Sequence, residues 1–415
     1  MTIVVFSQVS SSQLLAWVVR GGGATLTTKQ IDVPSAEKSL TQLIELTRRT
    51  IGARARQCQA AVRSAAETAD RSALAPPTVD EAALDEAQRR GDLSLSDDDN
   101  EGDDGSSSTA TTPDSRQIKT LKIGTPAPAA TPATSNDGPL VQLLRRCHEL
   151  LIAPLGLAEG EPLLLVPDRD LYALPFAALV DTDGRHLIER HSLRVAPSVG
   201  TVIELEARAA DQAATAKPEA LVVGDPTFHG WADQLAGAKA EAQDVAAALS
   251  ASAAFEGVAT LIGDEATKPA VVEAMRRCDV VHLATHGEPD GVLLGGATKG
   301  DGKLSMGEVQ SLELRARLVV LSECDSFRGK LTADGVIGIT RAFVAAGAQT
   351  LVASLWKVDD VATKALMQRF YARLLAGGAV GDATAAMQGA MVSMIADDRR
   401  WSVLEWAAFV VYGLA

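Results

Sequence analysis

The sequence has few aromatic residues, few cysteines and no long apolar run. Phe, Trp and Tyr make up 4% of its 415 residues and hydrophobic residues make up 47%, so we expect a core built mainly from Ala, Val and Leu. No run of about 18 apolar residues occurs, which is the length that a transmembrane helix needs. The N-terminus also lacks the basic region of a secretory signal. These absences predict a cytoplasmic protein.

The four cysteines show no spacing typical of a metal site or a disulfide framework. The chain has no CxxC pair, no Walker loop, no glycine-rich dinucleotide fingerprint and no HExxH motif. We therefore expect no bound metal and no cofactor. Free thiols are the expected state of all four cysteines, which are Cys58, Cys147, Cys278 and Cys324.

Basic residues are outnumbered by acidic ones. With 39 Lys and Arg against 53 Asp and Glu, the formal net charge is −14 and the pI is about 5.0. Nucleic acids and anionic membranes both bind through basic surfaces. The composition therefore predicts neither a nucleic-acid partner nor a membrane partner.

Composition divides the chain into three predicted parts. Residues 1–71 contain two or three short strands and a helix, which we expect to pack on the core. Residues 72–139 are rich in Asp, Pro, Ala, Thr and Ser, and such a segment buries too little apolar surface to offset the entropy of ordering it. We expect a disordered insertion there, either a solvated spacer or a cleavable or regulatory loop. Residues 140–415 form the main domain, with a first part at 140–250 and a catalytic part at 251–415.

Strands and helices alternate through the main domain. Apolar runs bounded by polar breakers lie at residues 162–166, 220–224, 279–284, 318–321 and 350–355. Such runs are typical of buried parallel strands. Because helical segments separate them, the pattern predicts an α/β fold with a mostly parallel sheet flanked by helices on both faces. One helix is expected at 335–346, and a short hairpin is expected around 187–198.

Two of these runs end at residues that could act as nucleophile and base. His286 and Gly287 follow one run, and Cys324 follows another. In open α/β sheets the ligand crevice lies at the carboxyl ends of the strands, where an imidazole can activate a thiol. Spacing alone leaves two interpretations open, a Cys–His catalytic pair or a buried cysteine that packs as a small hydrophobe. His282 shares the strand face of His286 but has apolar neighbours, so we expect a packed core histidine.

Several motifs occur in a fixed order along the main domain. They include His-Leu-Ala-Thr-His-Gly (282–287), Leu-Val-Val-Leu-Ser-Glu-Cys-Asp-Ser (318–326) and Val-Ala-Ser-Leu-Trp-Lys-Val-Asp-Asp (352–360), with further motifs at 166–179, 222–226 and 406–413. Together they resemble the CHAT domain, a caspase-like module of the clan that includes caspases, separases and metacaspases. The resemblance covers about residues 140–415. It implies a caspase-like fold and a cysteine peptidase that acts on a protein or peptide substrate.

The same resemblance implies roles for individual residues. His286 is the general base and Cys324 is the nucleophile of a Cys–His dyad. The backbone N–H groups of Gly287 and Cys324 form the oxyanion site. Each such donor stabilises a tetrahedral oxyanion by about 3–4 kcal/mol.

Acidic residues surround the expected nucleophile. The family usually has a small residue before the cysteine, whereas this chain has Glu323. Glu323, Asp325 or the pair Asp359 and Asp360 could line a substrate pocket and favour a basic P1 residue. Glu323 is alternatively a tolerated surface change or a mark of lost activity. Asp360 alternatively favours the N-terminus of the next helix.

The chain lacks the tetratricopeptide repeats that many family members carry ahead of this domain, since no helical period of about 34 residues occurs. We therefore expect either a stand-alone form or a form whose sensor is a separate regulatory protein partner. Our prediction is a caspase-like cysteine endopeptidase in signalling, activated by a partner or signal. The alternative is a catalytically weak or inactive domain that acts as a protein-interaction scaffold.

Overall fold

The computed structural model describes residues 1–10, 12–21, 25–33, 40–51, 138–211, 217–288, 290–322, 330–332, 335–397 and 401–414. The predicted insertion at 72–139 lies almost wholly outside these residues, and Glu323, Cys324 and Asp325 lie outside them as well. Within the described ranges, no helix is both long enough and apolar enough to cross a membrane.

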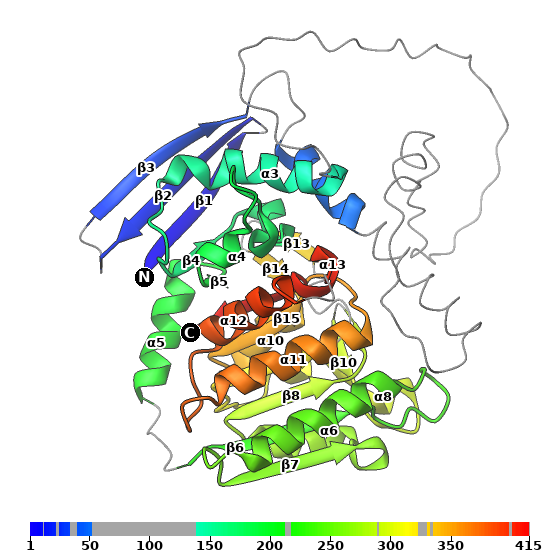
Figure 1. Ribbon diagram of the computed structural model, residues 1–415. Coiled ribbons are helices and arrows are strands. Elements are labelled where there is room, and N and C mark those ends of the chain that lie inside the picture. Colours follow the sequence, from blue (N-terminus) through cyan, green and yellow to red (C-terminus); the bar gives the residue numbers. More distant parts are fainter. Residues whose placement is uncertain are drawn as a thin grey trace, which may run out of the picture. The chain divides into compact units, whose positions relative to one another are not determined.

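An eleven-stranded sheet forms the centre of the described structure (Figure 1). Its strands, in order across the sheet, are β3 (Thr25–Asp32), β2 (Gln13–Arg20), β1 (Thr2–Ser10), β4 (Leu163–Val166), β5 (Leu193–Val195), β16 (Phe409–Gly413), β15 (Thr350–Ser354), β12 (Leu318–Ser322), β8 (Val280–Ala284), β6 (Glu219–Gly224) and β7 (Gly257–Ile262). Neighbouring strands run parallel except β3–β2, β2–β1 and β16–β15. The predicted mostly parallel α/β sheet is confirmed.

Helices bury the central strands. Every residue of β8, β12 and β15 is buried, which requires apolar neighbours on both faces of the sheet. The longer helices are α3 (Pro139–Leu151), α5 (Val199–Asp211), α6 (Ala236–Ala251), α7 (Lys268–Met275), α10 (Ile339–Ala346), α11 (Asp360–Leu374) and α12 (Ala383–Ile395). Figure 1 shows α6, α11 and α12 side by side, with α11 in contact with both of the others.

Shorter elements connect these layers. Short helices are α4 (Leu187–Arg190), α8 (Lys299–Gly302), α9 (Met306–Gln310) and α13 (Val403–Trp406), and the 3-10 turns are η1 (Ala153–Leu155), η2 (Arg169–Ala173), η3 (Phe176–Ala178) and η4 (Gly263–Glu265). A small three-stranded sheet contains β9 (Gly287–Glu288), β10 (Gly291–Leu293) and β11 (Lys303–Ser305). A separate hairpin contains β13 (Lys330–Thr332) and β14 (Gly335–Ile337).

The three N-terminal strands extend the main sheet as an antiparallel meander. β1 pairs with β2 along one edge and runs parallel to β4 along the other. Burial alternates along β1, where Val4 and Phe6 face the core. A helix at residues 40–51 contacts α3, since Thr47 Oγ1 lies 3.9 Å from Cys147 Sγ. The strands and the helix expected from the sequence are therefore both present.

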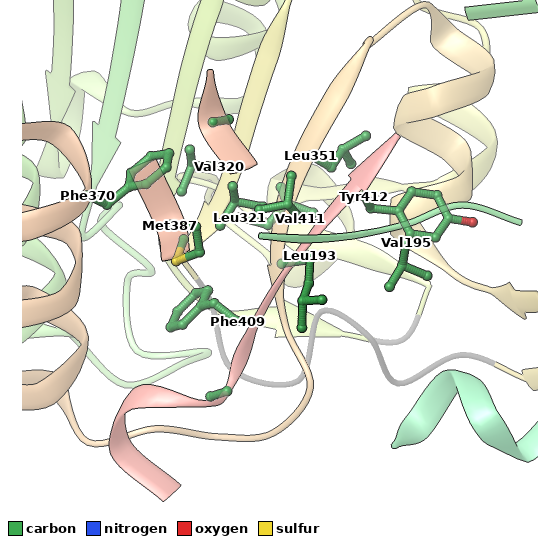
Figure 2. Close-up of a cluster of buried hydrophobic side chains, with 14 of the residues drawn as sticks. Leu193, Val195, Val320, Leu321, Leu351, Phe370, Met387, Phe409, Val411 and Tyr412 are labelled. Atoms are coloured by element: carbon green, nitrogen blue, oxygen red, sulfur yellow. The ribbon is translucent and has the colours of Figure 1, made fainter. Parts of the chain in front are cut away.

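Leu, Val and Ala supply most of the core, as the low aromatic content predicts. Figure 2 shows the part of the core around β16, where strand side chains meet those of α11 and α12. The side chains labelled there are Leu193, Val195, Val320, Leu321, Leu351, Phe370, Met387, Phe409, Val411 and Tyr412. Their packing holds β16 between β5 and β15.

Two predicted elements differ from the structure. The helix expected at 335–346 begins only at Ile339, because residues 335–337 form β14 and pair with β13. The hairpin expected around 187–198 is α4 followed by β5. A capping contact starts α4, in which the Glu189 carboxylate accepts the His186 N–H at 2.6 Å. This one carboxylate, three residues past the cap, outweighs the apolar pattern that suggested a strand.

Three titratable side chains are buried together where β8, α6 and α11 meet. His282 and Tyr371 have no exposed surface, and Glu241 is 4% exposed. Tyr371 Oη lies 3.1 Å from His282 Nδ1, and Glu241 Oε1 lies 3.1 Å from His282 Nε2 without hydrogen-bond alignment. Burial and the Glu241 carboxylate raise the pKa of Tyr371 well above its usual value, so its hydroxyl keeps its proton and can donate to Nδ1. The predicted core histidine is confirmed, and it ties three elements together.

Removing Glu241 should therefore cost much more stability than removing the tyrosine hydroxyl. Glu241→Ala leaves His282 Nε2 buried with no acceptor beside it and removes buried side-chain atoms, so we expect a loss of about 2–4 kcal/mol in the free energy of unfolding. Tyr371→Phe keeps the ring and removes one neutral hydrogen bond, so we expect a loss of about 1 kcal/mol. Urea unfolding followed by circular dichroism measures both. Equal losses of about 1 kcal/mol would show that the contact between Glu241 and His282 stabilises the fold no more than the tyrosine hydrogen bond does.

Candidate active site

His286 lies just beyond the carboxyl end of β8. The parallel register places Ala284, the last residue of β8, opposite Ser322, the last residue of β12. In the sequence, His286 follows Ala284 by two residues, and Cys324 follows Ser322 by two. Because Cys324 lies outside the described residues, its contact with His286 stays a prediction.

The His286 ring is held by a backbone carbonyl. Its Nε2 lies 2.8 Å from the backbone oxygen of Asp233, in the loop between β6 and α6. A carbonyl oxygen only accepts hydrogen bonds, so Nε2 carries the hydrogen and the Nδ1 lone pair is left to act as a base. The Phe228 ring packs against the imidazole with centroids 5.4 Å apart. Sequence analysis did not predict this partner, because any residue can supply a backbone carbonyl.

Gly287 presents its N–H away from the neighbouring strand. β9 pairs antiparallel with β10, with Gly287 opposite Val292, and the Leu293 N–H donates to the His286 carbonyl at 3.0 Å. In an antiparallel ladder, residues whose N–H and C=O groups face the partner alternate with residues whose groups face away. His286 and Leu293 form a facing pair, so the next residue, Gly287, points its N–H outward. This orientation suits the oxyanion donor that the resemblance implies.

Asp359 and Asp360 have different surroundings. Asp359 caps α11, because its Oδ1 accepts the N–H groups of Val361 at 2.9 Å and Ala362 at 3.2 Å. Asp360 is the first residue of α11, and its carboxylate accepts no hydrogen bond from the described residues. Partial burial, Asp359 and Glu241 together raise the pKa of Asp360, while Lys357 and His286 act in the opposite direction. Asp360 is therefore a carboxylate that interacts electrostatically with His286.

A glycine on α6 makes room for Asp360. A Cβ added to Gly237 would lie 2.1 Å from Asp360 Oδ2 and 2.5 Å from Asp360 Cβ. Rotation of the aspartate side chain cannot relieve the second contact. Gly237 therefore sets how closely the first turn of α6 approaches the first turn of α11, beside the histidine.

The described cysteines outside this region are poor nucleophiles. Cys147 and Cys278 are both buried. Burial raises the pKa of Cys147 to about 12 and that of Cys278 to about 11. Both thiols therefore stay protonated at neutral pH. The part of the chain that the structure describes also contains no group of three or more His, Cys, Asp or Glu side chains arranged to bind a metal.

Sequence comparison establishes the family. The family model of the CHAT domain matches residues 141–414. The chain belongs to the CHAT domain family. Tetratricopeptide repeat protein 28 of Homo sapiens is 29% identical over 329 residues, and the protein of that name from Mus musculus is 29% identical over 330. Each match covers 65% of this CHAT-domain chain and 13% of the relative's length.

Structural comparison places this CHAT domain among caspase-like folds. The separase–securin complex of Saccharomyces cerevisiae matches across 100% of this chain and 30% of that chain, with a TM-score of 0.56 and 10% identity. The Arg-specific cysteine proteinase gingipain R matches across 68% of each chain, with a TM-score of 0.45 and 11% identity. At 10% identity the separase likeness shows the fold alone. That fold is the caspase-like one predicted from the sequence.

Neutralising Asp360 should stabilise the protein at neutral pH. Its raised pKa means that the folded state prefers the protonated carboxyl, so the ionised form destabilises the fold. Asp360→Asn is expected to raise the melting temperature at neutral pH. This gain should shrink as the pH falls through the range in which the wild-type carboxyl becomes protonated, which begins at the raised pKa and ends near about pH 4, the usual aspartate value.

The neighbouring aspartate provides a matched control. Asp359→Ala removes a helix cap, so we expect a loss of about 1 kcal/mol and a lower melting temperature. Differential scanning calorimetry across pH measures both variants. A lower melting temperature for Asp360→Asn at neutral pH would show that the ionised carboxylate is stabilised rather than strained.

Proposed function

We propose that this CHAT domain is a caspase-like cysteine endopeptidase with Cys324 as nucleophile and His286 as general base. The observation that carries the proposal is the anchored histidine, whose Nε2 hydrogen bond to the Asp233 carbonyl leaves Nδ1 as the basic atom. The β8–β12 register supports it, since it aligns the strand ends that precede the two residues. The caspase-like fold and the family are consistent with this chemistry.

The proposed mechanism is acyl transfer through a thioester. His286 Nδ1 takes the thiol proton of Cys324, and the thiolate attacks the carbonyl carbon of the scissile peptide. The Gly287 and Cys324 N–H groups stabilise the resulting oxyanion. The carbon–nitrogen bond then breaks as the imidazolium gives its proton to the leaving amine. Water, deprotonated by the imidazole, hydrolyses the thioester and regenerates the thiol.

The acidic surroundings favour a substrate with a basic P1 residue. Asp360 is a partly buried carboxylate without a hydrogen-bond partner among the described residues, and it interacts electrostatically with His286. An Arg or Lys side chain would supply the missing charge. Glu323, Asp325 and Asp359 remain proposed members of the same pocket, although Asp359 is already engaged as a helix cap.

A protein-interaction role is the second candidate. It is favoured by the curated relatives, which bear the name of a repeat protein and of which this chain spans 13%. In this alternative the domain is weak or inactive and acts as a scaffold for signalling partners. The two candidates share a cytoplasmic location and a regulatory protein partner, and they differ in the reactivity of Cys324.

An electrophilic probe separates the two candidates. We expect a peptidyl acyloxymethyl ketone to modify Cys324 selectively, and His286→Ala should slow this modification by about 100-fold or more because the general base is lost. Mass spectrometry of the intact chain and its peptides locates the label, with Cys58 as the internal control for ordinary thiol reactivity. Labelling of Cys324 at the rate of Cys58, unchanged by His286→Ala, would favour the scaffold.

Substrate preference tests the acidic pocket. In a peptide library we expect cleavage after Arg or Lys, and Asp360→Asn should lower kcat/KM for these substrates by about 10- to 100-fold, the loss of one charge-assisted hydrogen bond. Glu323→Gln and Asp325→Asn are measured in parallel to assign the pocket. Cleavage after uncharged residues that is unaffected by all three substitutions would contradict a basic P1 preference.

A further inference from the structure

The loop at residues 225–235 carries two groups that touch the His286 ring. It leads from the end of β6 to the start of α6. Phe228 packs its ring against the imidazole, and Asp233 accepts the Nε2 hydrogen through its backbone oxygen. The orientation of His286 therefore depends on how firmly this loop is held.

Asp225 ties the beginning of the loop to its end. Its side chain is buried, with the residue 8% exposed, and its Oδ1 accepts the Leu235 N–H at 2.6 Å and the Gln234 Nε2–H at 3.0 Å. Its own N–H donates to the carbonyl of Ala284 at 3.1 Å. Ala284 is the last residue of β8, two residues before His286. One aspartate thus links the strand that carries the histidine to the segment that carries its partner.

Gln234 holds the middle of the loop. Its Oε1 accepts the Phe228 N–H at 3.1 Å, and its Nε2 also lies 3.3 Å from the Pro226 carbonyl. The far side of the loop is fixed by Trp231, whose Nε1–H donates to the Gly296 carbonyl at 2.8 Å. Asp233, whose carbonyl accepts the His286 hydrogen, lies between Trp231 and Gln234 in the chain. The contacts of these two residues therefore restrain Asp233 from both sides.

The backbone at Asp225 is in the left-handed region, with φ of 44°. Non-glycine residues rarely adopt this conformation, and Asp and Asn are among those that tolerate it best. A buried carboxylate also loses its hydration, so it needs its hydrogen bonds to offset that loss. A loop that only connected β6 to α6 would require neither a left-handed backbone nor a buried carboxylate at this position.

We propose that Asp225, acting with Gln234, is a positioning residue that holds His286 in the orientation and tautomer of a general base. Only the catalytic readout of this inference rests on the proposed function. A misplacement of a catalytic group by about 1 Å can cost about 100-fold in rate. The competing explanation is that Asp225 only caps the loop before α6 and contributes stability alone.

Two substitutions at the same position distinguish these explanations. Asp225→Gly removes the acceptor but permits the left-handed backbone, whereas Asp225→Asn keeps both the acceptor oxygen and the backbone preference. Asp382→Gly is the stability control, because Asp382 Oδ1 accepts two backbone N–H groups at the start of α12 and Asp382 has no contact with His286 in the described structure. All variants are compared at a temperature where each is folded.

The first readout is the rate at which iodoacetamide alkylates Cys324. We expect Asp225→Gly to lower this rate by about 10- to 100-fold and Asp225→Asn to restore most of it. Asp382→Gly should leave the rate unchanged while lowering the melting temperature. An unchanged rate in Asp225→Gly, with a loss of stability like that of Asp382→Gly, would assign Asp225 a purely structural role.

The second readout is independent of catalysis. In ¹⁵N-histidine-labelled Cys324→Ala protein, the ring nitrogens of His286 should show a neutral imidazole with the hydrogen fixed on Nε2. The signals of the six histidines are assigned by single substitutions. Asp225→Gly should change the His286 signals toward an exchanging mixture, and Asp225→Asn should not.

These two readouts separate the inference from the proposed function. If wild-type Cys324 reacts like an ordinary thiol, the peptidase proposal fails, and the ring signals still decide whether Asp225 positions His286. Identical His286 signals in wild type and Asp225→Gly overturn the positioning role whatever the thiol reactivity.

Discussion

Parallel pairing of β8 with β12 is the constraint on which the candidate site depends. Neighbouring strands lie only about 4.8 Å apart. When two parallel strands end in register, the residues that follow them therefore lie close together at the same edge of the sheet. Ala284 and Ser322 end their strands in such a register. The strands themselves are fixed by complete burial on both faces. The histidine thus takes its position from a backbone ladder and needs the neighbouring loop mainly for its orientation.

Around this strand end, the fold keeps several groups in unfavourable states. Asp360 is a carboxylate with a raised pKa, Glu241 is almost fully buried, and Asp225 has a left-handed backbone. Perturbed titratable groups and backbone strain concentrate at functional sites, where the surrounding structure maintains them. The buried contacts between α6, β8 and α11 supply that support here.

The sequence predicted the parts of this structure that depend on apolar periodicity. Continuous apolar runs located the central strands, and the end of one of these runs placed His286 and Gly287 just beyond β8. Periodicity failed where short-range hydrogen bonding decides, as in α4, where the Glu189 carboxylate begins a helix in an apolar segment. The Asp233 carbonyl was unpredictable for another reason, since no side chain marks it. The sequence also did not predict that Asp359 caps α11, because this role depends on the residue at which the helix begins.

The place of β16 in the sheet has a consequence for folding. Its residues 409–413 lie late in the chain, yet they occupy the middle of the sheet, between β5 and β15. Until β16 is in place, the sheet consists of two separate parts. One part ends at β5 and the other ends at β15, and each of these two strands has one unpaired edge. Open edges promote aggregation, and long-range strand pairing is slow. Assembly of the complete sheet should thus be among the last events of folding.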